Sequence, residues 1–302
     1  MNVRLEAIST ERARPATRAG DYLELTKPRI TALVVLTTYV GFYLGVQGRI
    51  DPWLVLHALL GTAMVCAAAS ALNQVWEREA DARMRRTQRR PLPAERLGQN
   101  EALLFGVALA IVGLLQLALF VNMLASLLAA ATLASYLFLY TPLKRRTWLC
   151  TTVGAVPGAL PPVIGWAAAR GGVDLGAASL FAIVFIWQLP HFYAIAWMYR
   201  DDYARGGFPM LTVIDPEGAV TGRQIVAWAA ALVPASLLPA LLGMAGALYF
   251  AGALVLGAGF LALAVRLAWT CEVVHARRVF LASIVYLPVI LGLLVLDRVP
   301  PL

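Results

Sequence analysis

The sequence predicts an all-α, polytopic membrane protein with nine transmembrane helices packed as one bundle. The chain has 302 residues, of which 60% are hydrophobic and 14% are charged. Soluble domains carry about 25% charged residues, so this composition excludes an ordinary large soluble protein. Nine apolar runs are each about long enough to cross the ~30 Å hydrocarbon layer of a bilayer. The basic residues also fall almost entirely on one side of these runs, as they do in membrane proteins.

The apolar runs follow one another along the chain and are joined by short polar connections. They cover residues 30–48, 52–76, 101–121, 123–142, 149–169, 176–198, 225–243, 246–270 and 279–296. The shortest breaks lie at Asn122 and between Gly243 and Gly246. If either break were only a kink, the number of spans would fall.

The basic residues test both the span count and the orientation. When the N-terminus is placed in the cytoplasm and the loops alternate, only Arg49, Arg170 and Arg298 of the 25 Lys and Arg residues lie outside. This asymmetry predicts an N-in, C-out topology. Residues 1–28 then form a cytoplasmic tail without the apolar segment of a signal peptide, and residues 29–298 form the membrane domain. The three cysteines are scattered and predict neither disulfides nor a metal site.

Polar residues directly follow the second apolar run. Asn73, Glu77 and Asp81 are spaced i, i+4 and i+8, so on a helix they lie along one stripe. Charge beside a membrane span is costly and indicates function. Three oxygen-bearing side chains suit Mg²⁺, particularly a Mg²⁺ carried by a substrate phosphate. The arginines just beyond, which include Arg86 and Arg90, are placed to bind such a phosphate.

A second acidic cluster, Asp201 and Asp202, follows the sixth run on the same predicted face. Two carboxylate clusters on one face can hold two metal ions against one diphosphate. An exposed loop with an aspartate helix cap explains Asp201 and Asp202 equally well at this stage.

Other polar residues allow more than one interpretation. His191 lies in an apolar run and is either a hydrogen-bonded core residue or a haem ligand, proton carrier or substrate contact. Lys144 and Arg145, like Lys27 and Arg29, either anchor a helix at the membrane surface or lie near the diphosphate. Tyr136 and Tyr140 can line a cavity, where aromatic faces stabilise an allylic cation.

Several ordered sequence blocks resemble the UbiA-type intramembrane prenyltransferases. Asn73-x-x-x-Glu77-x-x-x-Asp81, followed by Arg86-Thr87-x-x-Arg90-Pro91, is similar to the first aspartate-rich motif of that family. The finer resemblance is to its protoheme IX farnesyltransferase (haem O synthase) branch. The blocks that carry it are Leu25–Arg29, Tyr140–Arg145, Gly158–Trp166, Pro190–Phe192 and Asp202–Leu211. The sequence departs from the family pattern in having Glu77 for an aspartate and a second motif reduced to Asp201-Asp202, which puts a second metal in doubt.

The resemblance implies a bundle around a central cavity that opens to lipid and is capped by cytoplasmic loops. It implies transfer of the farnesyl group of farnesyl diphosphate to a vinyl group of haem B, with addition of water, which yields haem O and diphosphate. Mg²⁺ is the implied cofactor, with Asn73, Glu77, Asp81 and Asp202 as ligands and Asp201 beside them. The implied substrate-binding residues are Lys27, Arg29, Arg86, Thr87, Arg90, Tyr136, Tyr140, Lys144, Arg145, His191 and Tyr203. Haem-copper oxidase assembly or a haem A synthase would take the product, and no nucleic acid is implied.

Three rival functions are compatible with parts of this pattern. A prenyltransferase with another acceptor shares the first motif but not the blocks around His191 and Tyr203. A transporter or channel explains the spans but not carboxylates and arginines gathered on one face. An assembly or structural membrane protein predicts no such cluster. We therefore expect an enzyme of the prenyltransferase type.

Overall fold

The computed structural model describes residues 17–299, and all regular elements in that range are helical. In chain order they are α1 (Arg18–Leu25), α2 (Pro28–Gly45), α3 (Pro52–Arg83), α4 (Gln99–Phe120), α5 (Met123–Ala134), the π-helical turn η1 (Ser135–Tyr140), α6 (Thr141–Leu143), α7 (Cys150–Ala159), α8 (Pro161–Arg170), α9 (Leu175–Met198), α10 (Arg200–Arg205), α11 (Leu211–Ile214), α12 (Ala219–Leu241), α13 (Ala247–Thr270) and α14 (Val273–Leu296). The all-α prediction is confirmed. Residues 1–16 of the predicted tail lie outside the described range.

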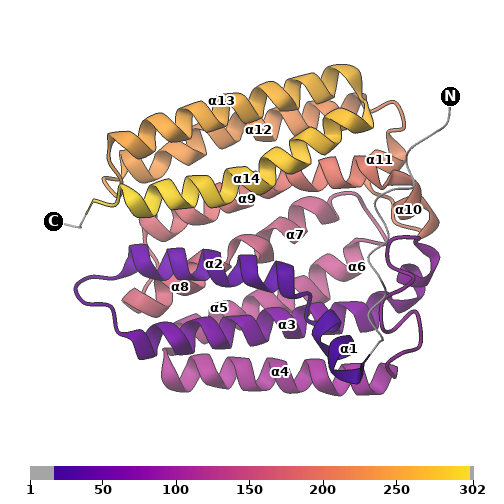
Figure 1. The fold of residues 1–302 in the computed structure, drawn as a ribbon, viewed down its shortest axis with the longest axis horizontal. Coiled ribbons are helices and arrows are strands. Elements are labelled where there is room, and N and C mark those ends of the chain that lie inside the picture. Colours follow the sequence, from indigo (N-terminus) through magenta and orange to yellow (C-terminus); the bar gives the residue numbers. More distant parts are fainter. Residues whose placement is uncertain (1–16, 300–302) are drawn as a thin grey trace.

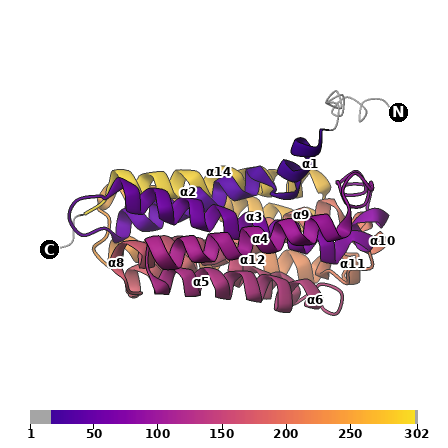
Figure 2. The same cartoon turned by 90° about the horizontal axis from the view of Figure 1, so that it is seen from below.

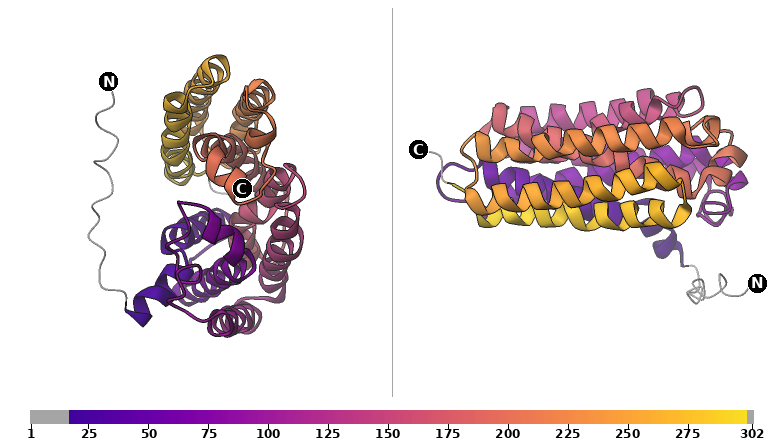
Figure 3. Two further views of the ribbon diagram at one scale, coloured as in Figure 1. Left: turned by 90° about the vertical axis from the view of Figure 1, so that its right-hand side faces the viewer. Right: turned by 90° about the horizontal axis from the view of Figure 1, so that it is seen from above.

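The long helices run side by side across the whole molecule (Figure 1). The short helices α1, α10 and α11 gather at one end, whereas α14 finishes at the opposite end (Figures 1 and 2). Seen end-on, the helices form an arc of two groups, with α2–α5 in one group and α9 and α12–α14 in the other (Figure 3). One buried apolar cluster lies mainly among α9 and α12–α14 but also includes Val40 and Leu44 of α2, and a smaller one lies mainly among α2–α5. Helices α7 and α8 connect the two groups.

Eight of the described helical segments are long and apolar enough to cross a membrane. The sequence predicted nine. The difference is α2, which has only 18 residues and begins with Pro28 and Arg29. It nevertheless packs against both α3 and α8 and lies alongside the other long helices (Figure 1). The chain is therefore an integral membrane protein. The number of spans predicted from the sequence is one more than the number of spans found among the described residues.

Both short breaks between predicted spans are real turns. At Asn122, the side-chain Oδ1 accepts a hydrogen bond of 2.8 Å from the backbone N–H of Ala125 and so caps α5. The second break ends α12 at Leu241, and Gly243 adopts a left-handed φ of 71°. Glycine suits this conformation because it has no Cβ. Neither break is a kink inside one longer helix.

Two glycines allow α2 and α8 to pack unusually closely. A Cβ on Gly41 would collide with the backbone carbonyl of Pro162, and a Cβ on Gly165 would collide with that of Thr38. Small residues permit such backbone contact between membrane helices. The Gly158–Trp166 block therefore carries a helix crossing that fixes α2 against the middle of the bundle.

Helix α3 is long enough to carry the predicted site past the end of a hydrocarbon layer. It has 32 residues, so it is about 48 Å long at 1.5 Å per residue, against ~30 Å of hydrocarbon. The polar stripe occupies its last three turns. These turns reach the end of the bundle where α1 and α10 lie (Figure 1).

Candidate active site

Glu77 and Lys144 form a buried ion pair at the centre of the polar end of the bundle. Lys144 Nζ lies 3.0 and 2.9 Å from the two carboxylate oxygens of Glu77. The Lys144 side chain is only 11% exposed and the Glu77 side chain only 4%. Lys144 Nζ also lies 4.6 Å from the ring centre of Phe208. The pair joins α3 to the end of α6, so Lys144 lies beside the first motif.

Asp81 lies one helical turn further along α3 and pairs with Arg90. Arg90 Nη1 donates to Asp81 Oδ2 at 2.7 Å, and the Asp81 side chain is 1% exposed. Thr87 Oγ1 donates to the backbone carbonyl of Asp81 at 2.8 Å, which ties the following loop to the helix end. The other carboxylate oxygen, Asp81 Oδ1, is buried and has no hydrogen-bond partner among the described residues. A buried carboxylate oxygen without a donor is unusual in a folded protein, and a bound ligand would supply the missing partner of Asp81 Oδ1.

Lys27 adds a third cation close enough to Glu77 and Asp81 for their charges to act on it. It lies between α1 and α2 with φ 47° and ψ 64°, a left-handed conformation that costs a non-glycine residue energy. Burial, reinforced by the positive charge of Arg90, lowers the pKa of Lys27 to about 8. The negative charges of Glu77 and Asp81 act to raise the pKa of Lys27, and the positive charge of Lys144 acts to lower it. Three cations thus surround two carboxylates, which leaves a positive surplus that suits an anion.

A buried glutamine holds the turn that carries Lys27. Gln74 is 1% exposed, and its Nε2 donates to the carbonyl of Leu25 at 2.9 Å and to that of Ser70 at 3.1 Å. Leu25 is fully buried. Arg96 of the α3–α4 loop pairs with Asp21 at 2.8 Å. Helix α1 is therefore packed against α3 and its loop, although the sequence predicted only a tail there.

Asp202 holds the arginine loop rather than facing Glu77. Its two oxygens accept from the backbone N–H groups of Arg85 and Arg86, each at 3.2 Å, and it pairs with Arg205. Burial alone would raise the pKa of Asp202, but Arg205 and the two N–H groups hold it below its usual range. The guanidinium of Arg86 lies over Tyr203, with 6.0 Å between Cζ and the ring centre.

Three predicted site residues lie apart from this network. Asp201, Arg29 and Arg145 are exposed. None of them joins an ion pair with another described residue. Asp201 is exposed, whereas its neighbour Asp202 is only 7% exposed.

The turn η1 places two tyrosines beside the ion pairs. The rings of Tyr136 and Tyr140 lie 5.1 Å apart, centre to centre. Lys144 Nζ is 5.8 Å from the centre of the Tyr140 ring. Gly154 of α7 accommodates Tyr140, because a Cβ there would lie 2.5 Å from its Cδ2. Pairs of aromatic faces at this position can stabilise a nearby cation.

His191 is held between aromatic rings on α9 and α14. Its ring centre lies 5.2 Å from those of both Trp187 and Phe280. Its Nδ1 is 2.6 Å from Ser283 Oγ, which in turn donates to the carbonyl of Phe280 at 2.6 Å. Since the hydroxyl proton is used there, Nδ1 must be the donor to Ser283. The other ring nitrogen, Nε2, therefore carries a lone pair.

The carboxylates of the described residues are spread along the site rather than gathered. No group of three or more His, Cys, Asp or Glu residues in residues 17–299 is arranged to hold a metal. The donor set nevertheless fits a divalent cation already bound to phosphate. Glu77 and Asp81 supply buried carboxylates one turn apart, and Asp81 Oδ1 has a free lone pair. Such a cation needs only one or two protein carboxylates when phosphate supplies further oxygens.

Three buried residues of this region were missed by sequence reasoning. Thr141 bonds Asn73, Gln74 positions the Lys27 turn, and Ser283 bonds His191. Thr141 and Gln74 stand beside predicted residues in the quoted blocks, which is a signal that could have found them. Ser283 lies in the last third of the chain, where only hydropathy was informative.

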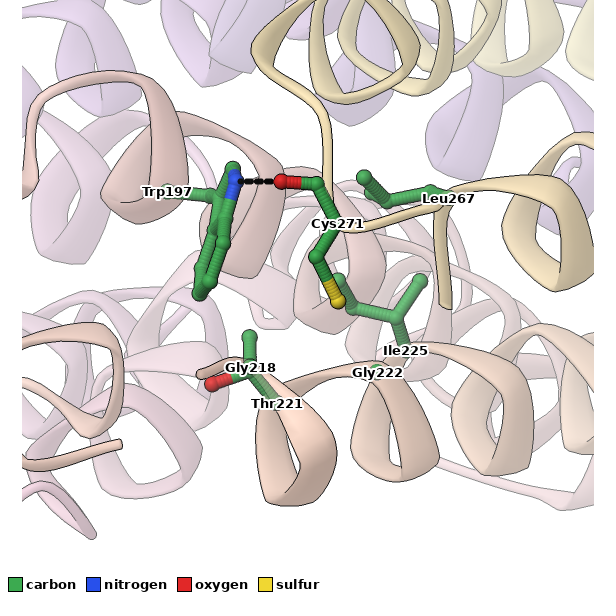
Figure 4. A pocket seen from close by; sticks show the side chains of 7 residues that line it. All are labelled: Trp197, Gly218, Thr221, Gly222, Ile225, Leu267 and Cys271. Atoms are coloured by element: carbon green, nitrogen blue, oxygen red, sulfur yellow. Dashed lines mark hydrogen bonds between the residues drawn. The ribbon is translucent and has the colours of Figure 1, made fainter. Parts of the chain in front are cut away.

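A separate small pocket lies between α9, α12 and the α13–α14 turn (Figure 4). It is lined by Trp197, Gly218, Thr221, Gly222, Ile225, Leu267 and Cys271. Trp197 Nε1 donates to the carbonyl of Cys271 at 3.0 Å across it. No charged side chain lines it, so it is not a site for a diphosphate.

Comparison with known proteins decides the family. Residues 34–287 match the UbiA prenyltransferase family. The chain belongs to the UbiA prenyltransferase family. It is therefore a membrane enzyme of the transferase class, as the sequence resemblance predicted.

Its relatives match over nearly their whole length. A protein from Solibacter usitatus named "Protoheme IX farnesyltransferase" is 54% identical over 92% of this chain and 98% of the relative. One of the same name from Aquifex aeolicus is 40% identical over 92% of this chain and 95% of the relative. These relatives also confirm the sequence resemblance to the protoheme IX farnesyltransferase branch of the family.

Solved structures share the fold at low sequence identity. A digeranylgeranylglyceryl phosphate synthase has a TM-score of 0.77 at 18% identity and covers 92% of this chain and 98% of its own. A UbiA homologue from Archaeoglobus fulgidus bound to GPP and Mg²⁺ has a TM-score of 0.62 at 15% identity, with 91% and 99% covered. At these identities the likeness establishes the fold alone.

Proposed function

We propose that this enzyme transfers the farnesyl group of farnesyl diphosphate to a vinyl group of haem B. The allylic C–O bond breaks and diphosphate leaves. The vinyl group forms the new C–C bond, and water supplies a hydroxyl group while a proton is released, which gives haem O. The names of the relatives support the two substrates. The observation that carries the proposal is the convergence of Lys27, Arg90 and Lys144 on the buried carboxylates Glu77 and Asp81.

In this proposal the three cations and Arg86 bind the diphosphate and stabilise the charge that develops as it leaves. Asn73, Glu77 and Asp81 would hold Mg²⁺, which neutralises diphosphate charge when bound. Asp202 fixes the loop of Arg86 and Thr87, and Asp201 lies further out. The Mg²⁺-bound UbiA homologue is consistent with this assignment.

The rings of Tyr136 and Tyr140 would face the allylic cation, and the apolar helices behind them would exclude water from it. His191 would contact haem through the free edge of its imidazole, with Tyr203 near Arg86. The N-terminus would lie in the cytoplasm of a bacterial cell, with residues 29–298 as the catalytic membrane domain. The product would pass to haem A synthase or haem-copper oxidase assembly.

The test is reconstitution of the purified protein in lipid nanodiscs with haem B, farnesyl diphosphate and Mg²⁺. Chromatography and mass spectrometry should detect haem O and an equal amount of diphosphate. The Asp81→Ala variant should insert normally and form no product. If the wild-type protein instead prenylates an aromatic acid or another tetrapyrrole and leaves haem B unchanged, the acceptor is wrong. If no diphosphate is released with any acceptor, the reaction class is wrong.

A further inference from the structure

The turn η1 exists because of the proline two residues after it. Pro142 has no N–H, and its ring would collide with the carbonyl of the residue four positions earlier in a regular α-helix. The widened π-turn relieves that collision, and the N–H of Thr141 bonds the carbonyl of Tyr136, five residues back. Single π-turns of this kind occur frequently at functional sites. Here the turn directs Thr141 toward α3.

The hydroxyl of Thr141 has only one proton, and its destination is fixed. Oγ1 donates to the carbonyl of Tyr136 at 2.9 Å, and a carbonyl can only accept. Oγ1 must therefore accept from its other neighbour, Asn73 Nδ2, which lies 3.2 Å away. Both Asn73 and Thr141 are 2% exposed. The two hydrogen bonds together remove the usual ambiguity between the oxygen and the nitrogen of an amide side chain.

Asn73 Nδ2 is committed to Thr141, and the Asn73 side chain is also hydrogen-bonded to Glu77, whose carboxylate can only accept, so the amide Oδ1 is left over. No described residue donates a hydrogen bond to this oxygen. The same helix carries Asp81 Oδ1, a buried carboxylate oxygen that also has no partner in residues 17–299. Two oxygens left without donors on one polar stripe indicate a ligand that accepts electron pairs, and a divalent cation is such a ligand.

We propose that Thr141 is a positioning residue for the metal-diphosphate site, because it turns the Asn73 amide so that its oxygen faces the divalent cation. This inference rests on the proposed function, in which Asn73 is a metal ligand. Without the hydroxyl of Thr141 the amide can rotate and present its NH₂ group, which repels a cation. Partners that orient metal ligands typically change metal affinity ten- to a hundredfold when they are lost.

The test measures metal binding directly as well as turnover. Thr141→Val removes the hydroxyl at nearly constant volume, and Thr141→Ser restores it. The matched control is Thr62→Val on α3, because Thr62 is also buried and its Oγ1 has no partner among the described residues. Electron paramagnetic resonance then follows the binding of Mn²⁺ to each purified variant in the presence of inorganic pyrophosphate.

We expect Thr141→Val to weaken Mn²⁺ binding about tenfold or more. The Mg²⁺ concentration for half-maximal turnover should rise by the same factor, while Thr141→Ser and Thr62→Val behave as wild type. A metal-free melting temperature close to wild type verifies that the variant is folded, and Thr141→Ala replaces Thr141→Val if the valine variant does not accumulate.

Wild-type Mn²⁺ affinity in Thr141→Val, together with a loss in Asn73→Ala, would overturn this inference and leave the proposed function intact. Wild-type affinity in Asn73→Ala as well would overturn the metal assignment of Asn73 and the inference with it. Loss of binding in both Thr141→Val and Thr141→Ser would also contradict the inference, because the hydroxyl would then not be the decisive group.

Discussion

Replacing Lys144 with methionine should destabilise the protein by leaving Glu77 charged and unpaired. The Glu77 side chain is 4% exposed, and Lys144 supplies both of its short ionic contacts. Removing one partner of a buried ion pair costs about 3–5 kcal/mol. Melting temperatures change by about 2–4 °C per kcal/mol in chains of 150–250 residues, so we expect a decrease of roughly 6–20 °C, toward the lower end because this chain has 302 residues.

The assay is thermal unfolding in detergent, followed with a thiol-reactive dye that reports exposure of the buried Cys150. The double variant Lys144→Met/Glu77→Gln should recover most of the loss, because no buried charge remains. Arg78→Met is the matched control, since Arg78 pairs with Glu95 at the surface, where the side chains are 39% and 80% exposed. Such a pair is worth at most about 1 kcal/mol.

Divalent metal gives a second readout of the same variant. In Lys144→Met, Mg²⁺ can compensate the free charge of Glu77, so Mg²⁺ alone should raise the melting temperature more than it does in wild type. The reasoning is refuted if Lys144→Met melts within about 2 °C of wild type. It is also refuted if the double variant is no more stable than the single one.

Three further predictions concern the site and its cover. Gly154→Ala should displace the ring of Tyr140 and reduce turnover in the haem O assay roughly ten- to hundredfold. Gly259→Ala is the control and should leave turnover unchanged, because the added Cβ would have no atom within 4 Å. Arg96→Ala should remove the ion pairs that hold α1 against the α3–α4 loop. If this lowers the free energy needed to detach α1 by about 1.4 kcal/mol, limited trypsin digestion should cleave within α1 about tenfold faster. Equal digestion rates in the variant and the wild type would contradict the role of Arg96 in packing α1. Chelation with EDTA should abolish turnover and added Mg²⁺ should restore it, whereas EDTA-resistant product formation would argue against a metal requirement.

The membrane spans could be predicted from sequence because hydropathy is a local property of each segment. Residues 101–121 were predicted and Gln99–Phe120 is found. The exception, α2, has only 18 residues and carries the charged Arg29 in its first turn, so its mean hydropathy is marginal for a span. Helix α1 was missed because it is held mainly by tertiary contacts such as that of Gln74 with Leu25, which no local pattern reveals.

The sequence indicated which residues gather at this end of α3, but not which cation pairs with which carboxylate. Helical spacing placed Glu77 and Asp81 on one stripe, and both are buried at the same end of α3. Which cation each would meet depends on how α6 and the α3–α4 loop fold back on α3. The same holds for Asp202, whose contacts with the Arg85–Arg86 backbone depend on a loop more than a hundred residues away in sequence.

The pairing of each carboxylate with its own cation has a consequence for the order of ligand binding. Magnesium arriving alone would have to displace Lys144 or Arg90, and pyrophosphate arriving alone would strand Glu77 or Asp81 without a counterion. If the two arrived as one complex, Glu77 and Asp81 would face the metal while Lys144 and Arg90 would face the phosphates, so every charge would keep an opposite neighbour. On the proposed function, we therefore expect the preassembled metal-diphosphate complex to bind better than either component alone.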